Sequence, residues 1–236
     1  MMGCTINSKK IVVPMTNKSY FNDPAKVKEG ATAIEKKWGS IVNPVSSMVG
    51  LPKEVILAFI NIESNGKADA SNGASIGLMQ TNPLTSATAF FTDLNQKRLT
   101  NAELSYLKFG IKKAGGNPDK VDLRNLKKDS KGNYILQPNL FTRKELFQPE
   151  VNILLGSMFV KQLIDTTHDA DNTARLDKVI TIYNTGFKTQ QMAKKFKGST
   201  DQLIAKVPSI TQAYIKKFVG KNGIIDSLTN QRVLII

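Results

Sequence analysis

Glu63 is the residue of this chain whose type and surroundings most favour chemistry. At helical spacing, Ile56, Phe59, Ile60 and Glu63 fall on one face, so that the carboxyl group lies at the end of an apolar stripe. Partial loss of water disfavours the charged form of a carboxyl group and raises its pKa. A carboxylic acid that stays protonated near neutral pH can act as a general acid. The competing interpretation is an ordinary acidic residue pointing into water near a helix end.

The segment that must position Glu63 is predicted to be a buried helix. It runs from Leu51 to Ile62 and is apolar on nearly every face, which is typical of a helix in a protein core. Pro52 is expected at its first position, where the missing N–H costs nothing. Burial of the whole helix favours the chemical interpretation of Glu63 over the solvated one.

Length and charge limit the classes of function. The chain has 236 residues, enough for one domain with a sizeable core or for two small ones. Lysine and arginine number 33 against 19 acidic residues, a formal charge of +14. Such a surplus favours an anionic polymer as partner, whether nucleic acid, a membrane surface or an acidic cell wall. The single cysteine, Cys4, excludes an intrachain disulfide, and the sequence shows neither a cleavable signal peptide nor an apolar run of membrane-spanning length.

The order of apolar patterns, glycines and prolines predicts a mainly α-helical chain. Residues 1–24 are polar and interrupted by Pro14, and we expect them to form an N-terminal arm, with a connector at residues 39–50. Residues 115–139 are rich in lysine and turn residues, which predicts a basic loop or hairpin insertion. The apolar residues 221–236 are expected to form a strand-like C-terminal tail that docks on its own domain or on a partner. Six further helices are predicted, over residues 25–38, 86–94, 101–113, 149–165, 175–184 and 208–219.

Five segments, in the same order along the chain, resemble motifs of the lytic transglycosylase and goose-type lysozyme superfamily. They are Glu63-Ser64, Gly77-Leu78-Met79-Gln80, Pro149-Glu150-Val151-Asn152-Ile153-x-x-Gly156, Ile182-Tyr183-Asn184-Thr185-Gly186, and Val207-Pro208 with Thr211 and Tyr214. Each motif is weak alone, and their order over residues 50–220 makes the signal. The chain also departs from the family: Ile210 stands where the last motif usually has glutamate, and Asn82 where goose-type hydrolases tend to have aspartate.

The resemblance implies a lysozyme-like, mainly α-helical domain over residues 25–220, with a small hairpin or loop insertion and a sugar-binding groove. Glu63 would be the catalytic residue in that groove. Gln80 and Asn184 would hydrogen-bond sugar and N-acetyl groups, Met79 would form part of the groove wall, and Gly77 would let the backbone approach the sugar. The full set of residues that would bind substrate is Ser64, Gly77, Met79, Gln80, Tyr183 and Asn184.

Cleavage of a glycosidic bond normally uses two carboxylates, one as acid and one as base or nucleophile. Near Glu63 the sequence offers only Glu54, on the first turn of the same helix, and Asp69, in the loop before the glycine motif. Transglycosylases of the resembled family use one glutamate. It protonates the oxygen linking N-acetylmuramic acid to N-acetylglucosamine, then takes the proton of the muramic C6 hydroxyl as a 1,6-anhydro ring closes. Because the attacking group belongs to the substrate, no water has to be positioned, and the scarcity of carboxylates favours transglycosylation.

Three alternatives stay open at this point. One is a muramidase that hydrolyses the same bond with Asp69 assisting, another a non-catalytic structural or wall-binding protein, and the last a nucleic-acid binder, which only the charge supports. Neither cofactor nor metal is expected, because the single histidine, His168, lies in a polar stretch without a ligand cluster. The expected partners are peptidoglycan glycan strands and other virion proteins, with no nucleic acid and no membrane span. A basic, signal-less chain of this family fits a bacteriophage protein carried in the virion or released at lysis, acting in the host periplasm or cell wall.

Overall fold

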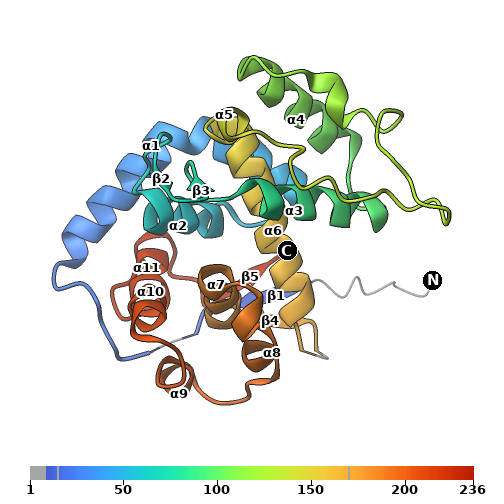
Figure 1. Ribbon diagram of the computed structural model, residues 1–236. Helices are drawn as coiled ribbons and strands as arrows, with labels where there is room; N and C mark the ends of the chain where they lie inside the picture. The colour runs from blue at the N-terminus through green and yellow to red at the C-terminus, as the bar shows by residue number, and fades with distance from the viewer. Residues whose placement is uncertain (1–8, 15, 170) are drawn as a thin grey trace, which may run out of the picture. The chain divides into compact units, whose positions relative to one another are not determined.

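The computed structural model describes residues 9–14, 16–169 and 171–236, and this part of the chain is mainly α-helical (Figure 1). It divides into two compact units. The central unit contains residues 33–161, and the terminal unit contains the described residues up to 32 together with residues 162–236. Among the described residues, no helix combines the length and the apolar character needed to cross a lipid bilayer.

The central unit is built around α2 (Lys53–Ser64), in which residues 55–60 are all buried. The helix predicted over 51–62 is confirmed with a shift of two residues at either end, and Pro52 precedes the first turn instead of occupying it. Two helices, α1 (Pro24–Val49) and α6 (Pro149–Thr167), also contribute residues to the terminal unit. The remaining elements are β2 (Ser71–Asn72), β3 (Ser75–Ile76), α3 (Pro83–Asn95), α4 (Asn101–Lys113), the 3-10 helix η1 (Pro118–Val121) and α5 (Arg143–Leu146).

The terminal unit combines a small sheet with short helices. Its sheet has the order β4-β1-β5, with β1 (Lys10–Val12) parallel to β4 (Thr173–Arg175) and antiparallel to β5 (Val233–Ile235). The middle residue of each strand faces the core, so that Ile11, Ala174 and Leu234 are paired in register and buried. The helices of this unit are α7 (Leu176–Thr185), α8 (Phe187–Lys195), α9 (Thr200–Ile204), α10 (Ser209–Val219) and α11 (Ile224–Leu228).

Side-chain caps explain where two of the helices begin. The Thr100 hydroxyl accepts a hydrogen bond from the N–H of Glu103 at 3.2 Å, and the Glu103 carboxylate accepts one from the N–H of Thr100 at 2.7 Å. This capping box starts α4 at Asn101, which confirms the boundaries predicted for that helix. At α3, the Asn82 side chain accepts from the N–H of Thr85 at 2.8 Å, so the helix begins three residues before the predicted start at residue 86.

The connector predicted at residues 39–50 is wrong, because α1 continues without interruption to Val49. Pro44 lies inside the helix and removes one backbone hydrogen bond, at a cost of about 3 kcal/mol. Val42 and Val45, on either side of it, are fully buried. Burial of each valine contributes about 1.5–3 kcal/mol, which offsets the proline.

The two ends of the chain also differ from their predicted structures. In the expected N-terminal arm, residues 1–8 and Met15 lie outside the described residues, whereas residues 10–12 form the central strand of the sheet. In the expected strand-like tail, residues 224–228 form α11 and only residues 233–235 form a strand. The apolar side chains that suggested a free tail are thus used within the terminal unit, where Ile224, Ile225 and Leu234 are buried.

The basic segment at residues 115–139 is largely irregular and exposed. It contains η1 and an antiparallel bridge between Lys128 and Tyr134 that closes a short hairpin-like loop. Asp129 organises the tip of this loop, because its carboxylate accepts hydrogen bonds from the N–H groups of Lys131 and Asn133, both at 2.9 Å. These hydrogen bonds also lower the pKa of Asp129 and keep its carboxyl group ionised.

Candidate functional site

Glu63 lies in the last turn of α2 and is half-buried. The next residue, Ser64, is buried, and its hydroxyl donates to the carbonyl of Ile60 at 3.0 Å. The helix then ends at Asn65, whose left-handed backbone (φ 50°) returns its N–H to the carbonyl of Asn61 at 2.9 Å. The serine hydroxyl thus serves the helix end, which fixes the direction in which the chain leaves Glu63.

The turn that follows Glu63 is held by α1. Gly66 has a φ of 71°, and a Cβ at this position would lie 3.0 Å from Cγ1 of Ile34. The indole N–H of Trp38 donates to the carbonyl of Gly66 at 3.0 Å. The Lys37 ammonium lies 4.9 Å from the centre of the Trp38 ring. The only tryptophan of the chain therefore anchors the loop next to Glu63.

The second turn after Glu63 in the sequence begins at Gly77, which has a φ of 75°. A Cβ there would lie 2.5 Å from Nδ2 of Asn152 and 2.6 Å from the carbonyl oxygen of Leu146, so no side chain fits. The N–H of Gly77 donates to the carbonyl of Ala70 at 2.8 Å, which closes the loop onto its own start. Packing against Asn152 alone accounts for a glycine, and its predicted role in sugar binding stays a prediction.

Asn152, on α6, is fully buried and clamps this turn from inside. Its amide nitrogen lies 2.8 Å from the carbonyl oxygens of Ile76 and Leu146 and 3.1 Å from the Thr81 hydroxyl. Its amide oxygen accepts from the N–H of Met79 at 2.7 Å. One side chain therefore fixes the backbone on both sides of the Gly77–Gln80 turn. The sequence-based site did not include Asn152, although the Asn-Ile-x-x-Gly segment that contains it was a usable signal.

Gln80 stabilises the same loop through hydrogen bonds of its side chain. It adopts a left-handed backbone (φ 45°), and its amide nitrogen donates to the carbonyls of Ala70 at 3.1 Å and Gly77 at 2.8 Å. The residue is half-buried, and its amide oxygen accepts no hydrogen bond from the described residues. The donor side of this amide is thus used by the fold, while the acceptor side is open to an incoming hydroxyl or N–H group.

Met79 differs from the expectation that it lines the groove. It is fully buried and packs on Gly156, where a Cβ would lie 2.7 Å from the methionine sulfur. The Ser157 hydroxyl lies 3.9 Å from the same sulfur. A side chain enclosed in this way has no surface to offer a sugar. The physical reason is the glycine on α6, which opens a space that the methionine fills.

The β2–β3 hairpin, between the two turns, is fixed from outside by Arg143 on α5. One guanidinium nitrogen, Nη1, donates to the carbonyl of Gly73 at 3.1 Å, and Nη2 donates to the Ser71 hydroxyl at 3.0 Å. Asp69, the alternative second carboxylate, is exposed in the turn that leads into this hairpin. All of the chain from α2 to Thr81 is therefore braced by residues of α1, α5 and α6.

Two of the seven predicted site residues, Tyr183 and Asn184, belong to the terminal unit, on the last turn of α7. Tyr183 is half-buried and Asn184 is exposed. The hydroxyl of Thr211, a buried residue of α10, donates to Oδ1 of Asn184 at 2.9 Å. This bond uses the side-chain oxygen of Asn184 and ties α10 to the end of α7. The five other site residues share the central unit.

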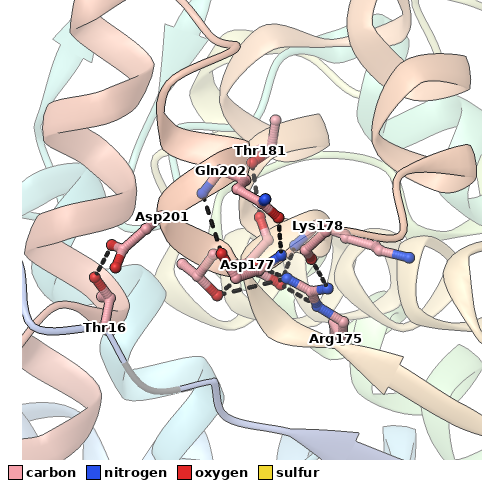
Figure 2. Close-up of polar contacts among 10 residues, drawn as sticks. Thr16, Arg175, Asp177, Lys178, Thr181, Asp201 and Gln202 are labelled. Atoms are coloured by element: carbon pink, nitrogen blue, oxygen red, sulfur yellow. Dashed lines mark hydrogen bonds and ion pairs between the residues drawn. The ribbon is translucent and has the colours of Figure 1, made fainter.

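The start of α7 is fixed by a buried ion pair (Figure 2). Asp177 is fully buried, and its carboxylate accepts from Nε and Nη2 of Arg175 at 3.2 and 2.6 Å. The Thr200 hydroxyl donates to the same carboxylate at 2.8 Å and thereby ties α9 to α7. Figure 2 also shows Thr16, whose hydroxyl bonds Asp201 on α9. Burial lowers the pKa of the neighbouring Lys178.

No group of three or more histidine, cysteine or acidic side chains with metal-binding geometry occurs among the described residues. No protein-family model matches the chain, and no curated protein matches it in sequence. The assignment of a function therefore depends on the residues and on their surroundings.

Proposed function

We propose that this protein is a peptidoglycan lytic transglycosylase in which Glu63 acts first as general acid and then as general base. The observation that carries the proposal is the setting of Glu63. A half-buried carboxyl group lies in the last turn of a helix whose residues 55–60 are all buried, and the loop that follows it contains two fixed turns, at Asn65–Gly66 and at Gly77–Gln80. Preorganisation of this kind is what an acid needs if it is to stay aligned with a leaving oxygen.

The surrounding motif residues support the same proposal. Gly77 and Asn152 make the turn that presents Gln80, and the Gln80 amide oxygen accepts nothing from the described residues. An amide acceptor of this kind suits a substrate rich in hydroxyl and N-acetyl groups. On the terminal unit, Asn184 is an exposed amide whose side-chain oxygen accepts a hydrogen bond from Thr211. The formal charge of +14 suits an acidic wall polymer.

The proposed reaction needs no group from outside the substrate and this carboxyl. The Glu63 proton goes to the glycosidic oxygen as the bond to muramic C1 breaks. The C6 hydroxyl of the same muramic residue then attacks C1, and its proton returns to the carboxylate. A 1,6-anhydro ring forms, no water is consumed, and Glu63 regains its starting protonation state.

Digestion of purified peptidoglycan in ¹⁸O-labelled water tests this proposal. We expect anhydro-ended muropeptides that are unlabelled and lighter by one water than hydrolytic products, and a loss of about 10²–10⁴-fold in rate for Glu63→Gln. Glu54→Gln, a charge-matched change on the first turn of α2, serves as the control and should keep its activity. Labelled reducing ends, abolished by Asp69→Asn, would instead identify a muramidase. Full activity of Glu63→Gln would refute the assignment of the site.

A further inference from the structure

A hollow of about 620 Å³ opens in the central unit, away from the turns that follow Glu63. It lies between the C-terminal end of α3, the connection to α4 and the basic insertion. We call it the cationic hollow, and its walls include Leu94, Lys97, Leu99, Leu123, Lys128 and Lys131. Its volume is in the range of sites that take small ligands, about 300–1,000 Å³.

The cationic hollow is preorganised, because Asn95 and Tyr134 join its two sides. The Asn95 side chain accepts from the N–H of Tyr134 at 2.8 Å and donates to the Tyr134 carbonyl at 3.0 Å. These two hydrogen bonds, one in each direction, connect the backbone of the insertion to the C-terminal end of α3. The Lys128 ammonium lies 4.5 Å from the centre of the Tyr134 ring, which places this charge at the wall of the hollow.

The charges of the hollow are unbalanced. Its lining contains three lysines and no acidic residue, and none of the three forms an ion pair with a described residue. Nearby cations outside the lining are paired instead: Arg98 with Asp93, Lys120 with Glu145, and Arg124 with Asp122. The closest acidic residue of the loop is Asp129, whose carboxylate is bonded to the amides of its own turn. The hollow therefore presents uncompensated positive charge to a ligand.

We infer that the cationic hollow binds a short peptide that carries carboxylates beside small apolar side chains. On the proposed function, on which this inference rests, that ligand is the acidic stem peptide attached to muramic acid. Ammonium groups of Lys97, Lys128 and Lys131 pair with its carboxylates. The three leucines of the wall provide apolar surface for methyl groups such as those of alanine.

Other anionic polymers fit the lining less well. Phosphate groups are preferentially bound by the planar fork of arginine, and the lining contains none. A polyphosphate has no apolar surface to cover the leucines. A single-stranded nucleic acid stacks its bases on open aromatic faces, whereas the one ring in the lining, Tyr134, has a lysine over it.

Equilibrium binding of N-acetylmuramyl-L-alanyl-D-glutamate, followed by calorimetry, tests the inference. The Glu63→Gln protein is used throughout, so that the measurement does not depend on catalysis. We expect Lys128→Gln with Lys131→Gln to weaken binding about tenfold, as the loss of two exposed ion pairs predicts. Lys112→Gln with Lys127→Gln removes the same charge from outside the hollow and should change binding less than about twofold, with melting curves confirming that both variants fold.

The outcomes separate this inference from the proposed function. Failure of the Glu63→Gln protein to bind the peptide, or equal losses in the two double variants, would overturn the inference. Tighter binding of poly(glycerol phosphate) or of a short oligothymidylate, lost in the same Lys128/Lys131 variant, would also overturn it in favour of a phosphate site. Cleavage of peptide-free glycan strands by the wild-type protein measures the proposed function alone. If that cleavage occurs without peptide binding, the enzyme proposal stands and the hollow has another role.

Discussion

Replacement of Asn152 by leucine should destabilise the central unit by about 3–5 kcal/mol. The amide nitrogen has two hydrogens for its three acceptors on Ile76, Leu146 and Thr81, so it makes about two full bonds, and the bond from Met79 is the third. Each bond contributes about 1–1.5 kcal/mol net, and the four partner residues are too deeply buried to recover a bond from bulk water. Leucine has the same branched outline as asparagine and is bulkier, so it leaves no room for a replacement water.

The fluorescence of Trp38, the only tryptophan of the chain, can be used to follow unfolding of the central unit. Its indole N–H donates a hydrogen bond to Gly66 within that unit. Urea unfolding followed by this signal should show a lower midpoint for Asn152→Leu and an unchanged m-value. Asn125→Ala is the matched control, since it removes an amide that makes one exposed bond to Asp119, and should cost less than about 0.5 kcal/mol. A loss below about 1 kcal/mol for Asn152→Leu would refute the view that this side chain holds the turn.

Three further changes test other parts of the structure. Gly156→Ala places a Cβ 2.9 Å from Cβ of Met79 and should cost about 1–3 kcal/mol in the same urea assay; no loss would mean that the methionine can move aside. Asp177→Asn breaks the pair with Arg175, whose side chain is 21% exposed, and should cost about 3 kcal/mol when the terminal unit is followed by circular dichroism. Burial raises the pKa of Tyr106 to about 12, so Tyr106→Phe should remove the last step of the phenolate absorbance titration. Because the folded pKa is raised, the stabilisation is complete below the ordinary value of 10.0 and is lost as the pH rises towards 12. Between pH 9 and pH 11.5, the unfolding midpoint of the wild type should therefore fall more than that of the variant.

The elements that could be predicted are those with local signals. The predicted boundaries of α4 are confirmed because Thr100 and Glu103 cap each other, and the apolar stripe of α2 predicted a buried helix. The sheet could not be predicted in this way. Its strands have three residues each, and β1 finds its partners at residues 173–175 and 233–235, far beyond the reach of any local pattern. The prediction of a connector at residues 39–50 was wrong for another reason. Pro44 indicated a break in the helix, but burial of the neighbouring valines stabilises the continuous helix α1.

For the site, residue types were easier to predict than their roles. The sequence indicated that Gly77 mattered, but only the contact with Asn152 shows why a side chain is excluded. It indicated Met79 as a wall residue, whereas the space above Gly156 takes it into the core. The cationic hollow was missed because its lysines are separated in the sequence and are brought together by one amide, Asn95, that no motif marks.

The pairing of β1 has a consequence for the order in which the protein is made. The ribosome synthesises residues 10–12 before the continuous block of residues 33–161, and their partner residues 233–235 after it. Units of a nascent chain fold as they emerge, so the central unit is able to form while the terminal unit lacks one edge of its sheet. Until the last strand arrives, β1 has an unpaired edge that any extended chain nearby could capture. A product that stalls before residue 233 should therefore aggregate through residues 10–12, even though its central unit is folded.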